Sequence, residues 1–298
     1  MSSSVRKAVI PVGGLGTRFL PVTRAVPKEM LPLLDKPSIQ WGLEECVASG
    51  IEQVVVVIDP GKYAIPDYFR RDRELELYLE ERGKHDLLEV VRAVDRLTHE
   101  VEMVYVPQLE PLGLGHAVWT ARHLIGDEPC AVLLPDDVIV AEPPCLRQLI
   151  DAHAEAGGTV IASRAVPRSQ LSRYGVFEIE SGPGPLHKVT DVVEKPSAED
   201  APSDLAIFGR YVLAPEVLDA LGGTQPGAGK EIQLTDAIRA TISTSRVSAL
   251  EFTGDLHDLG TIPGYLKANL ALGLRHPDLR EELLSLVREL AGERVTKE

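Results

Sequence analysis

The stretch Lys7-Ala-Val-Ile-Pro-Val-Gly-Gly-Leu-Gly-Thr-Arg18 sets the architecture at the start of the chain. Its first six residues form a largely apolar run that predicts a buried strand, and the rest form a glycine-rich turn. Because glycine has no Cβ atom, backbone N–H groups in such a turn can approach a phosphate closely. The turn lacks a P-loop pattern, and Phe19 replaces the third glycine of a dinucleotide fingerprint counted from Gly14. A plain strand-to-helix turn therefore stays as good an interpretation as a phosphate site.

Apolar runs and helix-period segments alternate along the first half of the chain. The apolar runs lie at 54–58, 101–106, 131–134 and 159–162, and the helix-period segments at 38–49, 63–82, 115–124 and 145–156. Continuous apolar runs are typical of parallel strands that are covered on both faces. Strands that alternate with helices predict an α/β sheet with helices on both of its faces.

The second half of the chain has a different pattern, with short strands between turns rich in glycine and proline. Strands are expected at 175–179, 189–193, 206–213 and 247–252, a helix at 232–243, and two helices at the end. This half is therefore expected to form a mixed sheet, and the charged tail 278–298 to pack one leucine stripe. No internal repeat or low-complexity linker divides the sequence, so residues 1–298 are expected to form a single domain.

Composition excludes several classes of protein. The 298 residues include 31 basic and 45 acidic side chains, for a net charge of -14, which disfavours binding to nucleic acid or to an anionic membrane. No apolar run approaches the roughly 20 residues of a membrane span, and no signal peptide is recognisable at the N-terminus. Three cysteines without C-x-x-C spacing favour neither disulfides nor zinc. We expect a cytoplasmic protein.

The segment after the glycine turn carries the most specific signal. Residues 19–37 contain four prolines, which forbid a continuous helix and leave a stiff loop that presents Arg18 and Lys28. With G-x-G-T-R before it and P-K-E-M-L-P inside it, this loop resembles the signature of sugar-1-phosphate nucleotidylyltransferases, in the form found in bacterial UTP–glucose-1-phosphate uridylyltransferases. Further blocks follow in family order at 108–117, 133–137, 174–176, 193–196, 205–213, 226–236, 257–261 and 264–268.

The resemblance covers about residues 5–275 and implies a Rossmann-like α/β domain of the nucleotide-diphospho-sugar transferase type, with a mixed, mainly parallel sheet flanked by helices. Residues 5–164 would bind the nucleotide, a smaller mixed region at 165–275 would bind the sugar, and 276–298 would form a C-terminal helix. The implied reaction joins UTP and glucose 1-phosphate into UDP-glucose and pyrophosphate, with the nucleotide bound first. The resemblance also implies Mg²⁺ as cofactor and a homodimer or homotetramer.

Such a reaction needs alignment and charge neutralisation more than a covalent nucleophile. Arg18 is placed to hold the departing β- and γ-phosphates, and Lys28 to reach the α-phosphate. Either residue taken alone would be a solvated cation, but the proline-rich loop argues against that interpretation. By resemblance, Lys195 completes the catalytic cations and binds the phosphate of the sugar.

Two aspartates are candidate metal ligands. Asp136 ends an apolar strand, where open α/β sheets collect ligands, and Asp258 follows a second strand-like run. The resemblance assigns Mg²⁺ to both, and carboxylate oxygens suit that ion, which also binds substrate phosphates. Asp137 is expected to support the turn. From the residues alone, an aspartate pair after a strand is more often a helix N-cap.

The remaining expected residues recognise the base and the sugar. The Gln108 amide offers a donor and an acceptor to a pyrimidine edge, beside the backbone of the glycine turn. By resemblance, the nucleotide set is Gly13, Gly14, Gly16, Thr17, Glu29, Gln108 and Gly113, and the sugar set is Gly175, Glu194 and Lys195. An exposed strand-end ion pair is the alternative for Glu194 and Lys195. No catalytic role is assigned to His116 or His257.

Two departures from the family pattern leave alternatives open. Asp59-Pro60 stands where many members have Gly-Arg, and Ile262 stands where a lysine often follows the second metal aspartate. The alternatives are a thymidylyltransferase, because thymine presents the same Watson–Crick edge as uracil, and a uridylyltransferase for another sugar 1-phosphate. A third alternative is a catalytically weak regulatory paralogue.

Overall fold

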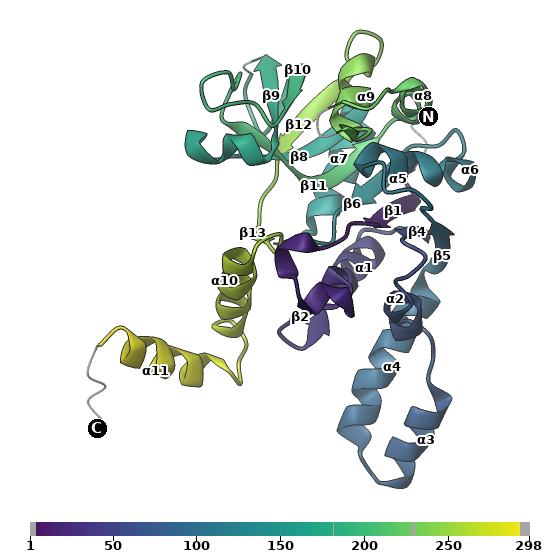
Figure 1. The fold of residues 1–298 in the computed structure, drawn as a ribbon, viewed down its shortest axis with the longest axis vertical. Coiled ribbons are helices and arrows are strands. Elements are labelled where there is room, and N and C mark those ends of the chain that lie inside the picture. Colours follow the sequence, from purple (N-terminus) through teal and green to yellow (C-terminus); the bar gives the residue numbers. More distant parts are fainter. Residues whose placement is uncertain (1–3, 181, 228–229, 293–298) are drawn as a thin grey trace.

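The computed structural model describes residues 4–180, 182–227 and 230–292 and is built around a nine-stranded sheet (Figure 1). In sheet order its strands are β5 (Glu102–Pro107), β4 (Gln53–Ile58), β1 (Lys7–Val12), β6 (Cys130–Leu133), β11 (Leu205–Leu213), β8 (Thr159–Ala165), β12 (Val247–Glu251), β10 (Leu186–Glu194) and β9 (Gly175–Glu180). Only β11 and β10 run opposite to the other seven strands of this sheet. The sheet is therefore mixed and mainly parallel in strand direction, as the sequence predicts.

Helices cover both faces of the sheet. One face is covered by α1 (Ser38–Ala48) and α7 (Cys145–Ala156), and the other by α5 (Leu114–Thr120), α8 (Pro215–Gly223) and α9 (Leu234–Thr241). Successive residues of β1 alternate between the two layers: Ala8 and Ile10 pack against the first, and Val9 packs against the second. All three are fully buried, which explains why this strand is continuously apolar.

The predicted helix over 63–82 is wrong in its extent. The structure divides that range into α2 (Ala64–Tyr68) and α3 (Arg73–Glu81), because Asp72 caps α3 by accepting a 3.0 Å hydrogen bond from the Leu75 N–H. A third helix, α4 (His85–Glu100), was not predicted from the sequence. It lies beside α3 as a projection from the sheet (Figure 1), where most of its side chains are exposed. The predicted helix over 115–124 is similarly divided into α5 and α6 (Arg122–Ile125).

The C-terminal helices α10 (Ile262–Gly273) and α11 (Arg280–Leu290) extend away from the sheet (Figure 1). The expectation that the tail packs a leucine stripe is met only in part among the described residues: Leu283 is half-buried against Gly273 of α10, but α11 has no fully buried residue and Leu290 is 78% exposed. The single expected helix over 276–298 shrinks to α11, and residues 293–298 lie outside the described part of the chain. Among the described helices, none combines the length and the apolar character that crossing a membrane requires.

Short elements gather at the carboxyl edge of the parallel strands. The proline-rich stretch forms three 3₁₀ turns, η1 (Thr17–Phe19), η2 (Val22–Arg24) and η3 (Lys28–Met30), followed by the strand pair β2 (Pro32–Leu33) and β3 (Lys36–Pro37). β7 (Asp137–Val140) follows β6 and pairs antiparallel with β13 (Asp255–Asp258), while η4 (Arg168–Arg173) precedes β9. Because parallel strands end on one edge, segments remote in sequence meet there.

Candidate active site

The glycine turn begins where β1 ends and is shaped by close neighbours. A Cβ atom added at Gly13 would lie 2.3 Å from Oε1 of Gln108, so a side chain there would displace that amide. Gly16 has φ +63°, and its carbonyl accepts a 2.9 Å hydrogen bond from the Thr23 hydroxyl. Gly14 lies beside the Lys28 side chain, since a Cβ there would be 3.8 Å from Cε. Thr17 is exposed at the start of η1.

Gln108 is held in one orientation beside this turn. It is 5% exposed, and its Nε2 donates to the Gly113 carbonyl at 3.3 Å and lies 3.0 Å from Nδ1 of His116. A carbonyl can only accept, so the amide nitrogen faces Gly113 and the amide oxygen faces Gly13. His116, to which the sequence assigned no catalytic role, is therefore the partner that helps to fix the amide. Its place in the first turn of α5 carried no signal of that contact.

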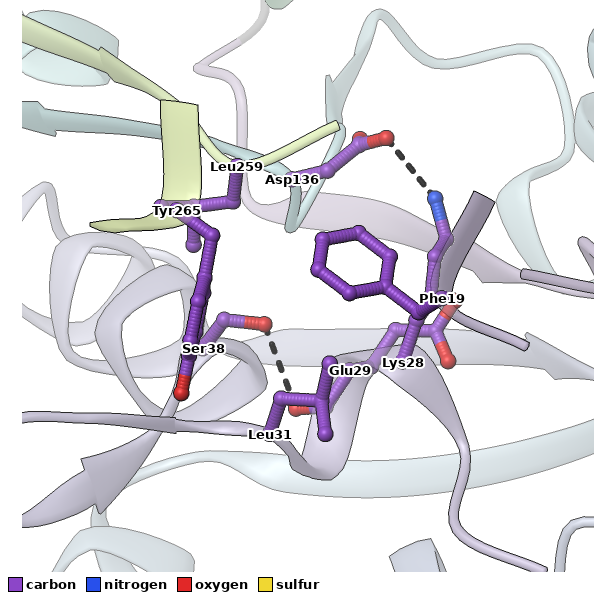
Figure 2. A pocket seen from close by; sticks show the side chains of 8 residues that line it. All are labelled: Phe19, Lys28, Glu29, Leu31, Ser38, Asp136, Leu259 and Tyr265. Atoms are coloured by element: carbon purple, nitrogen blue, oxygen red, sulfur yellow. Dashed lines mark hydrogen bonds and ion pairs between the residues drawn. The ribbon is translucent and has the colours of Figure 1, made fainter. Parts of the chain in front are cut away.

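Lys28 and Asp136 form an ion pair, with 2.7 Å between Nζ and Oδ2. Figure 2 shows the ammonium group directed at this carboxylate. The rings of Phe19 and Tyr265 line the same cavity and meet edge to face, with their centroids 5.8 Å apart. Burial alone lowers the pKa of Lys28, but attraction to Asp136 and Glu29 outweighs it and leaves the pKa raised. Burial raises the pKa of Asp136, but the charge of Lys28, hydrogen bonds from Lys28 and the backbone, and the charge of Arg18 together outweigh burial and lower it. Both side chains are therefore charged at neutral pH.

Glu29 is 1% exposed, and its ion-pair partner comes from the turn that follows β4. Nζ of Lys62, in the turn after β4, lies 2.9 Å from Oε2 of Glu29, 2.5 Å from the Val12 carbonyl oxygen and 2.8 Å from that of Gly14. Burial raises the pKa of Glu29, and the ammonium of Lys62 opposes that rise. Lys62 is not among the residues predicted from the sequence, and the only signal for it was its place in the turn that follows a buried parallel strand.

The two candidate metal ligands converge at one point. A Cβ atom added at Gly260 would lie 3.0 Å from Oδ1 of Asp258, 3.3 Å from Nη1 of Arg18 and 3.9 Å from Oδ2 of Asp136. The pairing of β7 with β13 brings them together, since the Leu259 N–H also donates to the Asp136 carbonyl at 2.7 Å. Arg18 donates to the Gly260 carbonyl at 3.1 Å. Two hard carboxylates and a cation thus surround one small space.

Two neighbours of these carboxylates complete the charge distribution. Asp137 accepts a 2.9 Å hydrogen bond from the Gly209 N–H, and burial, followed by the charge of Asp136, raises the pKa of Asp137 to about 7. Arg173, at the end of η4, donates to Oδ2 of Asp258. The repulsion among carboxylates here is the kind that a bound cation relieves.

The predicted sugar residues come together on the other side of the space. Glu194 accepts a 2.7 Å hydrogen bond from the Thr235 hydroxyl on α9, and its second oxygen lies 3.0 Å from Nζ of Lys195. A Cβ atom added at Gly175 would lie 2.8 Å from Cδ1 of Ile207 and 3.2 Å from Glu194, so the site needs glycine there. Sequence reasoning missed Thr235, although it lies inside one of the blocks that carry the resemblance.

One pocket of about 480 Å³ joins the two sides, which is large enough for part of a nucleotide sugar. Among the predicted site residues it is lined by Arg18, Asp136, Gly175, Glu194, Lys195 and Asp258, together with Arg173 and Thr235. Lys28 and Glu29 line a much smaller adjoining cavity of about 10 Å³ that also touches Asp136 (Figure 2). Asp136 is therefore the side chain shared by both spaces.

Known proteins resemble this chain over most of its length. A family model described as nucleotidyl transferase matches residues 7–273. A UTP–glucose-1-phosphate uridylyltransferase of Staphylococcus haemolyticus is 47% identical over 286 residues, covering 96% of this chain and 98% of that protein.

Solved structures show the same likeness. A UTP-bound UGPase from Acinetobacter baumannii has 39% identity and a TM-score of 0.88, covering 96% of this chain and 99% of that one. A UDP-glucose pyrophosphorylase complexed with UDP-glucose has 36% identity and a TM-score of 0.84, covering 91% and 100%. Since the family model spans most of the sequence and so similar a relative spans nearly all of it, the chain belongs to the nucleotidyl transferase family, which confirms the resemblance found in its motifs.

Proposed function

We propose that this chain transfers a uridylyl group from UTP to glucose 1-phosphate, giving UDP-glucose and pyrophosphate. The observation that carries the proposal is a pocket lined by two groups of charged residues, of which we assign the first to the phosphates and the second to the sugar. Arg18 and the carboxylates beside it form the first group, while Glu194 and Lys195 form the second. The names of the relatives, which specify UTP, glucose 1-phosphate and UDP-glucose, support the choice of substrates.

In this reaction, a phosphate oxygen of glucose 1-phosphate forms a bond to the α-phosphorus of UTP. The bond from that phosphorus to the bridging oxygen of the β-phosphate breaks, and pyrophosphate leaves with its electron pair. Arg18 holds the departing phosphates, since a guanidinium can bind two phosphate oxygens at once and only one of its nitrogens is engaged by Gly260. Lys28 binds the α-phosphate, where negative charge gathers as the new bond forms.

A divalent metal is typical of the nucleotidyl transferase family, and we propose that Asp136 and Asp258 hold Mg²⁺. These residues fit the ion, because two hard carboxylates face one space beside Gly260. Bound there, Mg²⁺ would neutralise the triphosphate and stabilise the leaving group. Within the described residues no three His, Cys, Asp or Glu side chains gather as a metal site, so waters and substrate phosphates would supply the other ligands.

Base and sugar are recognised on opposite sides of the site. The Gln108 amide oxygen, directed towards Gly13, can accept the N3–H of uracil, a donor that cytosine lacks. Thymine carries the same donor, so this contact does not separate UTP from dTTP. On the other side, the Glu194 carboxylate accepts sugar hydroxyls, and the Lys195 ammonium binds the sugar phosphate.

Pyrophosphate release measured over a grid of substrates tests the proposal. Each of UTP, dTTP, CTP, GTP and ATP is combined with glucose, galactose, N-acetylglucosamine and mannose 1-phosphates, with Mg²⁺ and then with excess EDTA. We expect a maximum at UTP with glucose 1-phosphate that EDTA abolishes. A maximum at dTTP indicates a thymidylyltransferase, and a maximum with another sugar 1-phosphate indicates that the enzyme is specific for that sugar instead of glucose. No turnover in any combination overturns the enzymatic proposal in favour of a regulatory paralogue.

A further inference from the structure

The turn after β4 brings a lysine to the nucleotide side of the site. Asp59-Pro60-Gly61-Lys62 forms a β-turn in which the Lys62 N–H donates to the Asp59 carbonyl at 3.0 Å. The Asp59 carboxylate reinforces the turn by accepting a 2.8 Å hydrogen bond from the Gly61 N–H. Asp at the first position and Pro at the second are favoured in such turns. The unusual Asp59-Pro60 pair therefore has a structural role, which is to set the direction of Lys62.

All three N–H donors of the Lys62 ammonium have acceptors within the protein. They are the carbonyl oxygens of Val12 and Gly14, at 2.5 and 2.8 Å, and Oε2 of Glu29, at 2.9 Å. The Lys62 side chain is only 13% exposed. An ammonium has three donors, so none is left for a phosphate, and Lys62 does not bind substrate directly in this arrangement.

These contacts determine where the glycine turn directs its own donors. In a trans peptide the C=O and N–H bonds point in opposite directions. Because the Val12 and Gly14 carbonyls face Lys62, the N–H groups of Gly13 and Leu15 face the other way. Two backbone donors of the turn are thereby oriented by one side chain from the neighbouring strand.

The third contact joins the turn to the segment that carries Lys28. Glu29 directly follows Lys28 in η3, and Lys62 neutralises its buried carboxylate. The second carboxylate oxygen of Glu29 has no hydrogen-bond partner among the described residues, so Lys62 provides the close ion pair of this group. Losing Lys62 would leave a buried charge unpaired and release the turn at the same time.

We propose that Lys62 is a positioning residue, which holds the glycine turn and the Lys28 segment in the conformation that binds the nucleoside triphosphate. The inference rests on the proposed function in one respect, namely that the nucleotide binds at this turn. A merely structural role for Lys62 would predict only a loss of stability on its replacement. The positioning role predicts, in addition, a loss of affinity for the nucleotide.

Lys7 provides a matched control at the opposite end of β1. Its ammonium also donates to two carbonyls, those of Leu124 and Ile125, both at 3.0 Å, and lies 3.4 Å from the Glu128 carboxylate. Its side chain is 25% exposed. Lys7→Met therefore removes the same kinds of contact as Lys62→Met, but far from the glycine turn.

The experiment compares UTP binding by isothermal titration calorimetry, in the presence of Mg²⁺, with the melting temperature for the wild type and both variants. We expect the dissociation constant for UTP to rise at least about tenfold in Lys62→Met, equivalent to about 1.4 kcal/mol, and to stay within about twofold in Lys7→Met. Both variants should melt below the wild type. Equal UTP affinities in the two variants would overturn the proposal.

A second pair of variants covers the case in which Lys62→Met does not fold. Lys62→Met/Glu29→Gln lacks the unpaired carboxylate and is compared with Glu29→Gln alone. The dissociation constant for UTP should again be about tenfold higher in the double variant than in Glu29→Gln. Equal dissociation constants in these two variants would overturn the proposal. Titration of the wild type with each nucleotide tests the proposed function separately. If another triphosphate binds best, the uridylyl assignment fails, while the same variants titrated with that nucleotide still test Lys62.

Discussion

The nucleotide side and the sugar side of the site are built differently. On the nucleotide side, Thr17 and Arg18 are exposed, but Glu29 and Gln108 are buried and already paired: they are 1% and 5% exposed, and each is held by contacts from other elements. On the sugar side Lys195 is 51% exposed and pairs only with its neighbour Glu194 among the described residues. Glu29 and Gln108 are therefore preorganised, whereas the Lys195 side chain can adjust when a ligand arrives. This contrast agrees with the expectation that the nucleotide binds first.

Replacing Asp136, which lines both the large pocket and the small adjoining cavity, should have the largest effect. Asp136→Ala removes a proposed metal ligand and leaves Lys28 without its 2.7 Å partner. We expect turnover to fall by about 10³ or more, which corresponds to about 4 kcal/mol of transition-state stabilisation. Steady-state rates over a Mg²⁺ titration test this, with circular dichroism to confirm the fold. Wild-type activity in this variant would remove Asp136 from the metal site.

On the sugar side, Glu194→Gln keeps the size of the side chain and removes its charge. Hydrogen bonds to charged groups contribute about 1.5–3 kcal/mol, so KM for glucose 1-phosphate should rise by about 10- to 100-fold. The dissociation constant for UTP should not change if the two sides are independent. Glu180→Gln is the control, because it likewise breaks a glutamate–lysine ion pair, in this case with Lys188 on the neighbouring strand. A parallel loss of UTP affinity in Glu194→Gln would contradict the contrast drawn above.

On the nucleotide side, Gln108→Leu should relax base choice. The amide oxygen can accept from uracil but not from cytosine, so its loss should reduce the ratio of kcat/KM for UTP over CTP by about tenfold. Gln148→Leu is the matched control, because that amide binds the Pro143 and Thr253 carbonyls on the surface. An unchanged ratio in Gln108→Leu would show that the base is read elsewhere.

The smallest expected effect comes from Thr235→Val. This change removes the 2.7 Å hydrogen bond to Glu194 but keeps the shape of the side chain. Because the carboxylate is no longer held in place, KM for glucose 1-phosphate should rise about fivefold, equivalent to about 1 kcal/mol of binding free energy. Thr241→Val, on the same helix, removes a hydrogen bond to the Ile238 carbonyl and should leave KM unaltered. Similar KM values for the two variants would mean that Thr235 does not orient Glu194.

Much of the fold follows from patterns between neighbours in sequence. The strand from Lys7 to Val12 was predictable because both faces of β1 are covered, and α7 was predictable to the residue because its apolar period ends at a glycine pair. The errors lie where the chain is exposed. The α3–α4 projection and α11 make few contacts with the sheet, so their charged, amphipathic sequences gave weak evidence of where each helix begins and what it packs against.

For the site, the sequence alone determined the family and the glycine turn, and it predicted which residues would surround the substrates. Motifs are short, and each is read within one segment of chain. The tertiary structure decided which groups meet across segments. Lys62 lies 48 residues from Gly14, and His116 reached Gln108 only because a helix starts beside that strand end. Such contacts depend on the order of strands in the sheet, since β1, β4 and β5 end side by side, and no local pattern in the sequence encodes that order.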